Sequence, residues 1–204
     1  MNDWQGTGTA GTGSGANLDE MRRRLRYALR DMRPHHLKWG DDSLDRAIAE
    51  AVADFSQAYP LRQKTTLKTT ASSRDIDLST LTDRITVEGV EYPTGDFPQT
   101  LVPFKVYGDT LTMQISSVPS ADDEDVDVHW GKKHTLDASS STLPIEHEEL
   151  ILLGAQAYAL LQRAEVAPDL AAEGNEKLGI FKLQLQAVKS RRPSMPRPFY
   201  VHRW

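Results

Sequence analysis

The sequence contains no cysteine, and no apolar run approaches the roughly 20 residues that a membrane-spanning helix needs. Without cysteine the chain has no disulfide framework, no thiolate zinc site and no cysteine nucleophile. The first residues do not combine a basic segment with an apolar stretch, so we expect no signal peptide. These absences predict a soluble protein that is made in the cytoplasm and has no membrane partner. Its 204 residues suit one sizeable domain, or one domain that carries a smaller insertion.

Acidic residues are in excess, yet one end of the chain has none. The net charge is −5, while residues 189–204 contain five lysines or arginines and no acid, so the rest of the chain carries −10. An acidic body is repelled by phosphates, which argues against non-specific DNA binding. The charge asymmetry therefore points to a partner for the basic tail.

Hydrophobic periodicity predicts four helices, over residues 18–32, 43–58, 145–164 and 169–190. Asn17 and Ser43 are the expected N-caps of the first two helices. Short strands are predicted between the second and third helices, over 64–70, 75–78, 84–92, 104–107, 110–116 and 125–130. Gly108-Asp109 is typical of a tight hairpin turn, and imperfect alternation predicts a bulge near Gly89.

The predicted fold is α+β, with a four-helix bundle core and a β-rich insertion between the second and third long helices. An extended N-terminal arm and a C-terminal tail complete it. The expected parts are a flexible Gly-rich arm at 1–17, a helical core at 18–61 and 143–190, an inserted β-rich subdomain at 62–134 and a docking tail at 191–204. The arm is expected to be flexible because its Gly/Thr/Ser composition buries too little apolar surface to offset the entropy of ordering.

The motifs that usually carry chemistry are incomplete. The Gly-rich arm lacks the lysine of a phosphate-binding loop, and Ser139-Ser140-Ser141 lacks the GxSxG pattern of a nucleophile elbow. In Glu146-His147-Glu148-Glu149 the position of the second zinc-binding histidine is Ile151, so an acidic first helical turn is the simpler interpretation. His35 and His36, with Asp41 and Asp42, could in principle bind a metal. Adjacent histidines tend to point apart, however, and no third ligand is clearly spaced to converge, so a solvated loop is favoured. We therefore expect no enzymatic activity, no metal and no cofactor.

Two charged groups admit more than one interpretation. The densest acidic run, Asp122, Asp123, Glu124 and Asp125, lacks the spacing of an EF-hand calcium loop. It is interpreted as a solvated loop, or as acids that face a DNA passage and repel DNA. The first helix carries Arg22, Arg23, Arg26 and Arg30. Such a face is usually solvated or paired with acids, and the alternative is a contact with another subunit or with nucleic acid.

The C-terminal tail combines prolines with residue types that are enriched at protein interfaces. Its candidate docking residues are Arg191, Arg192, Arg197, Phe199, Tyr200, Arg203 and Trp204. Three aromatic side chains exposed to water would lower solubility, so we expect this tail to dock on another chain. The alternative is that it folds back on its own core.

Three stretches resemble the head–tail adaptor (connector) proteins of tailed bacteriophages. The first is Trp39-Gly40-Asp41-Asp42-Ser43-Leu44, followed by Ala47-Ile48, Asp54-Phe55-Ser56 and Pro60. The second, residues 126–136, is similar to the strand V-x-V-x-Y-x-x-x-H-x-L of that group, with Trp130 in place of the tyrosine and with His134 at the histidine position. The third is Leu143-Pro144 followed by Glu148-Glu149-Leu150-Ile151. The resemblance spans residues 39–164 and excludes the arm and the tail.

This resemblance implies a structural virion protein of the neck, at the head–tail junction. Such adaptors form a ring, dodecameric in relatives, under the portal, where they extend the DNA channel and offer a platform to the tail. The implied partners are the portal protein, a tail or nozzle protein, copies of the chain itself, and DNA that passes through without specific binding. The resemblance also implies that the C-terminal segment clasps the portal.

Two other classes of function stay open. A DNA-binding packaging or regulatory factor would use the arginine face of the first helix, and its binding would weaken steeply with salt. An enzyme of an unfamiliar type is the third class, although no expected site geometry is present in the sequence.

Overall fold

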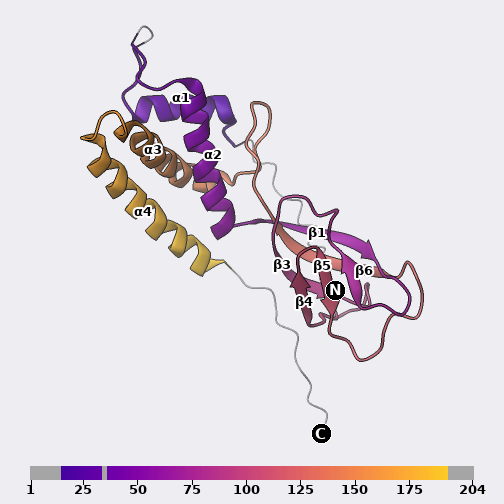
Figure 1. The fold of residues 1–204 in the computed structure, drawn as a ribbon. Coiled ribbons are helices and arrows are strands. Elements are labelled where there is room, and N and C mark those ends of the chain that lie inside the picture. Colours follow the sequence, from indigo (N-terminus) through magenta and orange to yellow (C-terminus); the bar gives the residue numbers. More distant parts are fainter. Residues whose placement is uncertain (1–14, 34–35, 193–204) are drawn as a thin grey trace, which may run out of the picture. The chain divides into compact units, whose positions relative to one another are not determined.

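The computed structural model describes residues 15–33 and 36–192 (Figure 1). The fold is α+β, as predicted, with four α-helices and two small antiparallel sheets in this described part. The chain divides into two compact units. The helical unit holds the described residues up to Tyr59 together with His134–Arg191, and the β unit holds Pro60–Lys133 together with Arg192.

Five elements build the helical unit: α1 (Leu18–Ala28), α2 (Asp41–Ala58), the short 3-10 turn η1 (Ile145–His147), α3 (Glu148–Ala164) and α4 (Leu170–Arg191). The side chain of Asn17 caps α1 as predicted, accepting a hydrogen bond of 2.9 Å from the backbone N–H of Glu20. None of the helices in the described ranges is long and apolar enough to cross a membrane.

Several helix ends differ from the prediction. Residues 145–147 form η1, so α3 begins at Glu148 and not at residue 145, and α4 spans Leu170–Arg191 and not 169–190. Helix α1 ends at Ala28 and not at residue 32, because Arg30 takes a left-handed φ of 53° and Asp31 N–H closes on the carbonyl of Arg26 at 2.9 Å. Helix α2 begins at Asp41 with Gly40 as N-cap, so the prediction of Ser43 as N-cap is wrong. The earlier start places two aspartates in the first turn, where the positive end of the helix dipole stabilises them.

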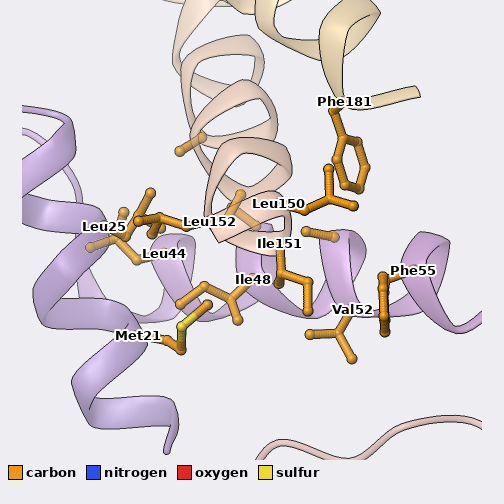
Figure 2. Packing of buried hydrophobic residues seen from close by; sticks show 14 of the residues in the cluster. Met21, Leu25, Leu44, Ile48, Val52, Phe55, Leu150, Ile151, Leu152 and Phe181 are labelled. Atoms are coloured by element: carbon orange, nitrogen blue, oxygen red, sulfur yellow. The ribbon is translucent and has the colours of Figure 1, made fainter. Parts of the chain in front are cut away.

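All four helices share one hydrophobic core. Its largest fully buried side chains include Phe55 on α2 and Phe181 on α4. Figure 2 shows side chains from the helices converging, with Leu25 of α1 near Leu44 of α2 and Met21 of α1 near Ile48 of α2. Burial of apolar surface on this scale is the main force that holds the unit together.

Six strands build the β unit: β1 (Leu61–Lys68), β2 (Asp75–Asp77), β3 (Arg84–Glu91), β4 (Phe104–Tyr107), β5 (Thr110–Met113) and β6 (Asp125–Lys132). They form two three-stranded antiparallel sheets, with the strand orders β1-β6-β3 and β2-β5-β4. The predicted bulge is confirmed by a register shift between Val87 and Gly89, and Gly108 turns the β4–β5 hairpin with a φ of 57°. The β unit has its own core, which includes Ile76, Leu111 and Val128.

Candidate functional site

The arginines of α1 are engaged by acids of the same chain. Arg22 donates twice to Asp45 on α2, at 2.7 Å from both Nε and Nη2, and its Nη1 lies 3.0 Å from Asp19. Arg23 pairs with Glu20 at 2.8 Å on the surface. Hydrogen bonds from Arg22 and Arg23 to these acids raise the pKa values of both guanidinium groups. Because Arg22 and Arg23 already pair with acids, they are less available to bind nucleic acid.

Arg26 joins α1 to the start of α2. Its guanidinium donates to Asp31 at 2.9 Å, to the backbone carbonyl of Trp39 at 3.1 Å and to Asp41 at 2.5 Å. The hydrogen bond from Arg26 lowers the pKa of the Asp41 carboxyl. Arg30, the fourth member of the predicted face, lies beyond the end of α1, so the four arginines do not form one helical face.

Asp31 is a buried acid, only 2% exposed, that the sequence did not single out. Besides Arg26, it accepts hydrogen bonds from the backbone N–H groups of Lys38 at 2.7 Å and Trp39 at 3.2 Å. The indole N–H of Trp39 donates to the carbonyl of Ala159 on α3 at 3.0 Å. The tryptophan of the first resembling stretch therefore anchors the loop before α2 to α3.

Glu148 begins α3 and is also buried, so the acidic run at 146–149 is partly structural. Its carboxylate accepts hydrogen bonds from Arg24 at 2.7 Å and from the backbone N–H of Ala16 at 2.6 Å. Glu149 pairs with the same Arg24. Sequence reasoning missed Arg24, and no local pattern reveals a partner that lies 124 residues away.

His134, the histidine of the second resembling stretch, lies buried at the edge of the helical unit. Its Nε2 is 2.9 Å from the carbonyl oxygen of Tyr59, and its Nδ1 is 2.9 Å from that of Thr142. The hydroxyl oxygen of Thr142 also lies 3.3 Å from Nδ1, and a hydroxyl can either donate or accept, so the roles at the ring depend on its tautomer. The backbone N–H of His134 donates to Ser56 Oγ at 3.0 Å, which ties the returning chain to the end of α2.

The acidic run at 122–125 forms an ordered turn within the β unit. Asp122 accepts a hydrogen bond of 2.7 Å from the backbone N–H of Ala71, and Asp125 pairs with Lys68 at 2.5 Å. Glu124 accepts from the hydroxyl of Tyr92 at 2.6 Å and from backbone N–H groups of the turn. The hydrogen bond between them lowers the pKa of Glu124 and raises the pKa of Tyr92 to about 12.

A second charged cluster, on the sheet β1-β6-β3, was not predicted. Lys64 pairs with Asp127 at 2.7 Å and lies 3.7 Å from Glu91, while Thr66 donates to Asp127 at 2.5 Å. Asp127 and Glu91 are both buried. Burial alone would raise the pKa of Asp127, but the hydrogen bonds from Lys64 and Thr66 outweigh it and lower that pKa. Among the described residues, no group of three or more histidines, aspartates or glutamates is placed to hold a metal ion.

The predicted docking tail is described only at its start. Arg191 is the exposed last residue of α4. Arg192 donates to Glu88 and, at 3.3 Å, to the carbonyl of Pro60, so its guanidinium is bound within the β unit. The other candidates, Arg197, Phe199, Tyr200, Arg203 and Trp204, lie outside the described residues, as does His35 of the histidine pair.

Similarity to known proteins appears at the levels of family and of solved structure. The family model described as SU10 adaptor protein matches residues 16–198. Among solved structures, a similar chain comes from the "Neck of empty GTA particle computed with C6 symmetry", with 16% sequence identity and a TM-score of 0.31. That similarity covers 72% of this chain and 78% of the other. No curated protein matches the chain.

Proposed function

Because the chain belongs to the SU10 adaptor protein family, as the match over residues 16–198 shows, we propose that it is a structural protein of the phage head–tail junction. The family match is the observation that carries this proposal. It agrees with the resemblance to head–tail adaptors in the sequence, which is confirmed at the level of the family. The proposed function is assembly. The four helices of the helical unit surround one core, which supports the interpretation of a four-helix bundle.

In detail, we propose that copies of the chain form a ring, dodecameric as in the adaptors it resembles, beneath the portal. The ring continues the DNA channel and gives the tail or nozzle protein a platform. The acidic body supports this role, because acids near the channel repel the phosphates of passing DNA. In the run at 122–125, Asp122, Asp123 and Asp125 are exposed, and they are the candidates proposed to face DNA.

The tail is proposed as the portal anchor. Arg191 is exposed at the end of α4, and beyond it lie Arg197, Arg203 and the aromatic residues of the last six positions. Arg192 differs from the others because it is bound to Glu88, so we place it as the point that fixes where the tail begins. Aromatic and arginine side chains are the types that most often dominate interface energies.

The test is assembly of the purified chain on purified portal rings, followed by electron microscopy and by mass measurement. We expect the full chain to add a ring and a chain that ends at Ser190 to add none. Two further variants separate the contributions of the tail. Phe199→Ala with Trp204→Ala removes aromatic side chains, and Arg197→Gln with Arg203→Gln removes positive charges. A stoichiometric ring formed by the chain that ends at Ser190 would overturn the docking role of the tail.

The matched control removes residues 2–14, which are most of the Gly-rich arm, and keeps the tail. It is expected to assemble like the full chain, because Ala16 and Asn17, which hold the arm to the helical unit and cap α1, remain. If both truncated chains fail to assemble, the loss of assembly is not specific to the tail.

A further inference from the structure

Helix α4 is apolar on two opposite sides, although only one of them packs inside the helical unit. Phe181 and Leu185 are buried in the core, and a Cβ added at Gly154 on α3 would lie 2.7 Å from the Phe181 ring. About half a turn around the helix, Ile180 and Leu183 remain 43% and 69% exposed. A surface helix normally places polar and charged residues on that side.

The exposed side forms a row with helical spacing of three and four residues. We call it the α4 stripe, and it consists of Ala172, Glu176, Gly179, Ile180, Leu183 and Ala187, all exposed. Glu176 is the only charged residue in the row. Contiguous apolar surface bordered by polar residues is typical of a protein contact site.

Gly179 adds a second observation. A Cβ at this position would meet nothing within 4 Å, so packing inside the chain does not require glycine there. Glycine in the middle of a helix destabilises it relative to alanine. At the centre of an exposed apolar row, this glycine leaves room for another backbone to approach α4 closely.

The helical unit also has a groove between α1 and α3, with a volume of about 530 Å³. Tyr27 and Met32 line it and are 76% and 55% exposed, and the buried Leu152 contributes to its wall. Arg23 lies at the groove with a side chain that is 73% exposed. It donates to both carboxylate oxygens of Glu20, at 2.9 Å from Nε and 2.8 Å from Nη2, so an acid of a partner would share Arg23 with Glu20 at the surface.

We propose that the α4 stripe of one copy packs into the α1/α3 groove of a second copy of this chain. This inference rests on the proposed ring and names the surfaces that form it. Ile180 and Leu183 enter the groove beside Tyr27 and Met32, and the one acid of the stripe, Glu176, meets the exposed Arg23. The apolar part of the groove, formed by Tyr27, Met32 and Leu152, fits the apolar side chains of the stripe. Its charged lining consists of Arg23, Arg24 and Glu149, so its net charge is positive and complements Glu176, which favours a second copy as the occupant.

The positions of the two surfaces on the helical unit decide what kind of assembly this contact builds. In Figure 1, α3 lies between α1 and α4, so the stripe and the groove are on different sides of the helical unit. A contact between two different surfaces is heterologous, and it leaves a free stripe and a free groove at the ends of every chain of copies. Repetition therefore builds a ring where the rotation closes. A two-fold contact of α4 with α4 stops at a dimer and leaves the groove empty.

Disulfide cross-linking tests the contact directly, because the chain has no cysteine of its own. Leu183→Cys and Tyr27→Cys are combined in one chain, the protein is assembled on portal rings, and the complex is oxidised and run on a non-reducing gel. We expect a ladder of dimers, trimers and larger species from the double variant and none from either single variant. The matched control pairs Tyr27→Cys with Lys182→Cys, which lies one residue earlier on the flank of α4, and is expected to give far less product.

Each outcome of the cross-linking experiment either supports or overturns the proposed contact. Dimers from Leu183→Cys alone would show a two-fold α4 contact and overturn the proposal. Portal-bound rings without a ladder from the double variant would also overturn it, while the proposed function stands. If the wild-type chain forms no ring on the portal, the proposed function fails by itself. In that case the concentrated double variant is oxidised without portal rings, and the absence of a ladder contradicts the contact.

A charge exchange provides an independent readout. Glu176→Arg and Arg23→Glu each place like charges at the contact, and we expect each to raise the concentration for half-maximal assembly about tenfold. Both residues are exposed, so the fold is retained. The two changes in one chain restore the opposite charges and are expected to restore assembly. If the combined variant assembles no better than the single variants, Glu176 does not meet Arg23.

Discussion

At the scale of single residues, His134 has the clearest structural role. Replacing it by alanine removes both ring contacts and leaves the carbonyls of Tyr59 and Thr142 without this buried partner. Because the loss of these buried ring contacts and a new cavity both destabilise, we expect His134→Ala to lower the free energy of unfolding by about 3 kcal/mol. Denaturant unfolding measures this. Lys133→Ala, an exposed neighbour, is the control and should change stability by less than about 0.5 kcal/mol.

Asp127 predicts a pH dependence of stability at the same scale. Its pKa is lowered in the folded chain, so it stabilises the fold above the usual aspartate pKa of about 4 and loses this contribution as the pH falls through the folded-state pKa. Asp127→Asn removes the titration and keeps an acceptor for Thr66. We expect the variant to be less stable at pH 7, with a difference that shrinks as the pH is lowered from 5 to 3. Urea midpoints at each pH measure this, and a constant difference would contradict the role of the Asp127 charge.

At the scale of elements, two glycines separate packing from helix propensity. Gly154 faces Phe181 so closely that an added Cβ would lie within 3 Å of three ring atoms, whereas Gly179 faces open space. We expect Gly179→Ala to stabilise the free chain by about 0.5–1 kcal/mol, because alanine favours the helix. Gly154→Ala gains the same propensity but overpacks a full core, and a net loss of about 1–2 kcal/mol is expected. Thermal unfolding of the two variants measures both signs, and equal shifts would mean that α4 moves to make room.

Much of the element order could be predicted from sequence, since apolar spacing and proline positions are local signals. The predicted helix over 43–58 differs from α2 only at its start, and the predicted strand over 104–107 coincides with β4. Element ends were less predictable. Helix α1 stops early because Arg30 turns into the left-handed region and because the Arg26–Asp31 pair holds the following loop. No helical periodicity signals such an ion pair.

Contacts between residues that are far apart in the chain could not be predicted from the sequence. The sequence shows the arginine face, but Asp45 becomes a partner of Arg22 only through packing of α1 on α2. In the same way, Arg24 and Glu148 meet only through packing of α1 on α3. The buried cluster of Lys64 and Asp127 depends on the non-sequential pairing of β1 with β6, which strand patterns alone do not select. For the predicted docking tail, the proposal still rests on composition and on the family.

At the scale of the whole molecule, the chain leaves and re-enters the helical unit at neighbouring points. Tyr59 and His134 are joined by the 2.9 Å contact of His134 Nε2, and just beyond them Leu61 and Lys132 are direct partners in the β1–β6 ladder. Paired residues of antiparallel strands lie about 5 Å apart. A short link can therefore replace the β unit without displacing either end.

We accordingly expect a chain in which three glycines replace residues 60–133 to keep the helical unit folded, because its core contains no residue of the β unit. Three extended residues span about 10 Å, which is enough for the gap. Circular dichroism should show a helical spectrum and a single cooperative unfolding transition. The control makes the same link but removes residues 56–134, so that Ser56, Tyr59 and His134 are lost, and it should be clearly less stable. If both shortened chains are unfolded, the helical unit depends on the β unit for its stability, and the two units fold as one.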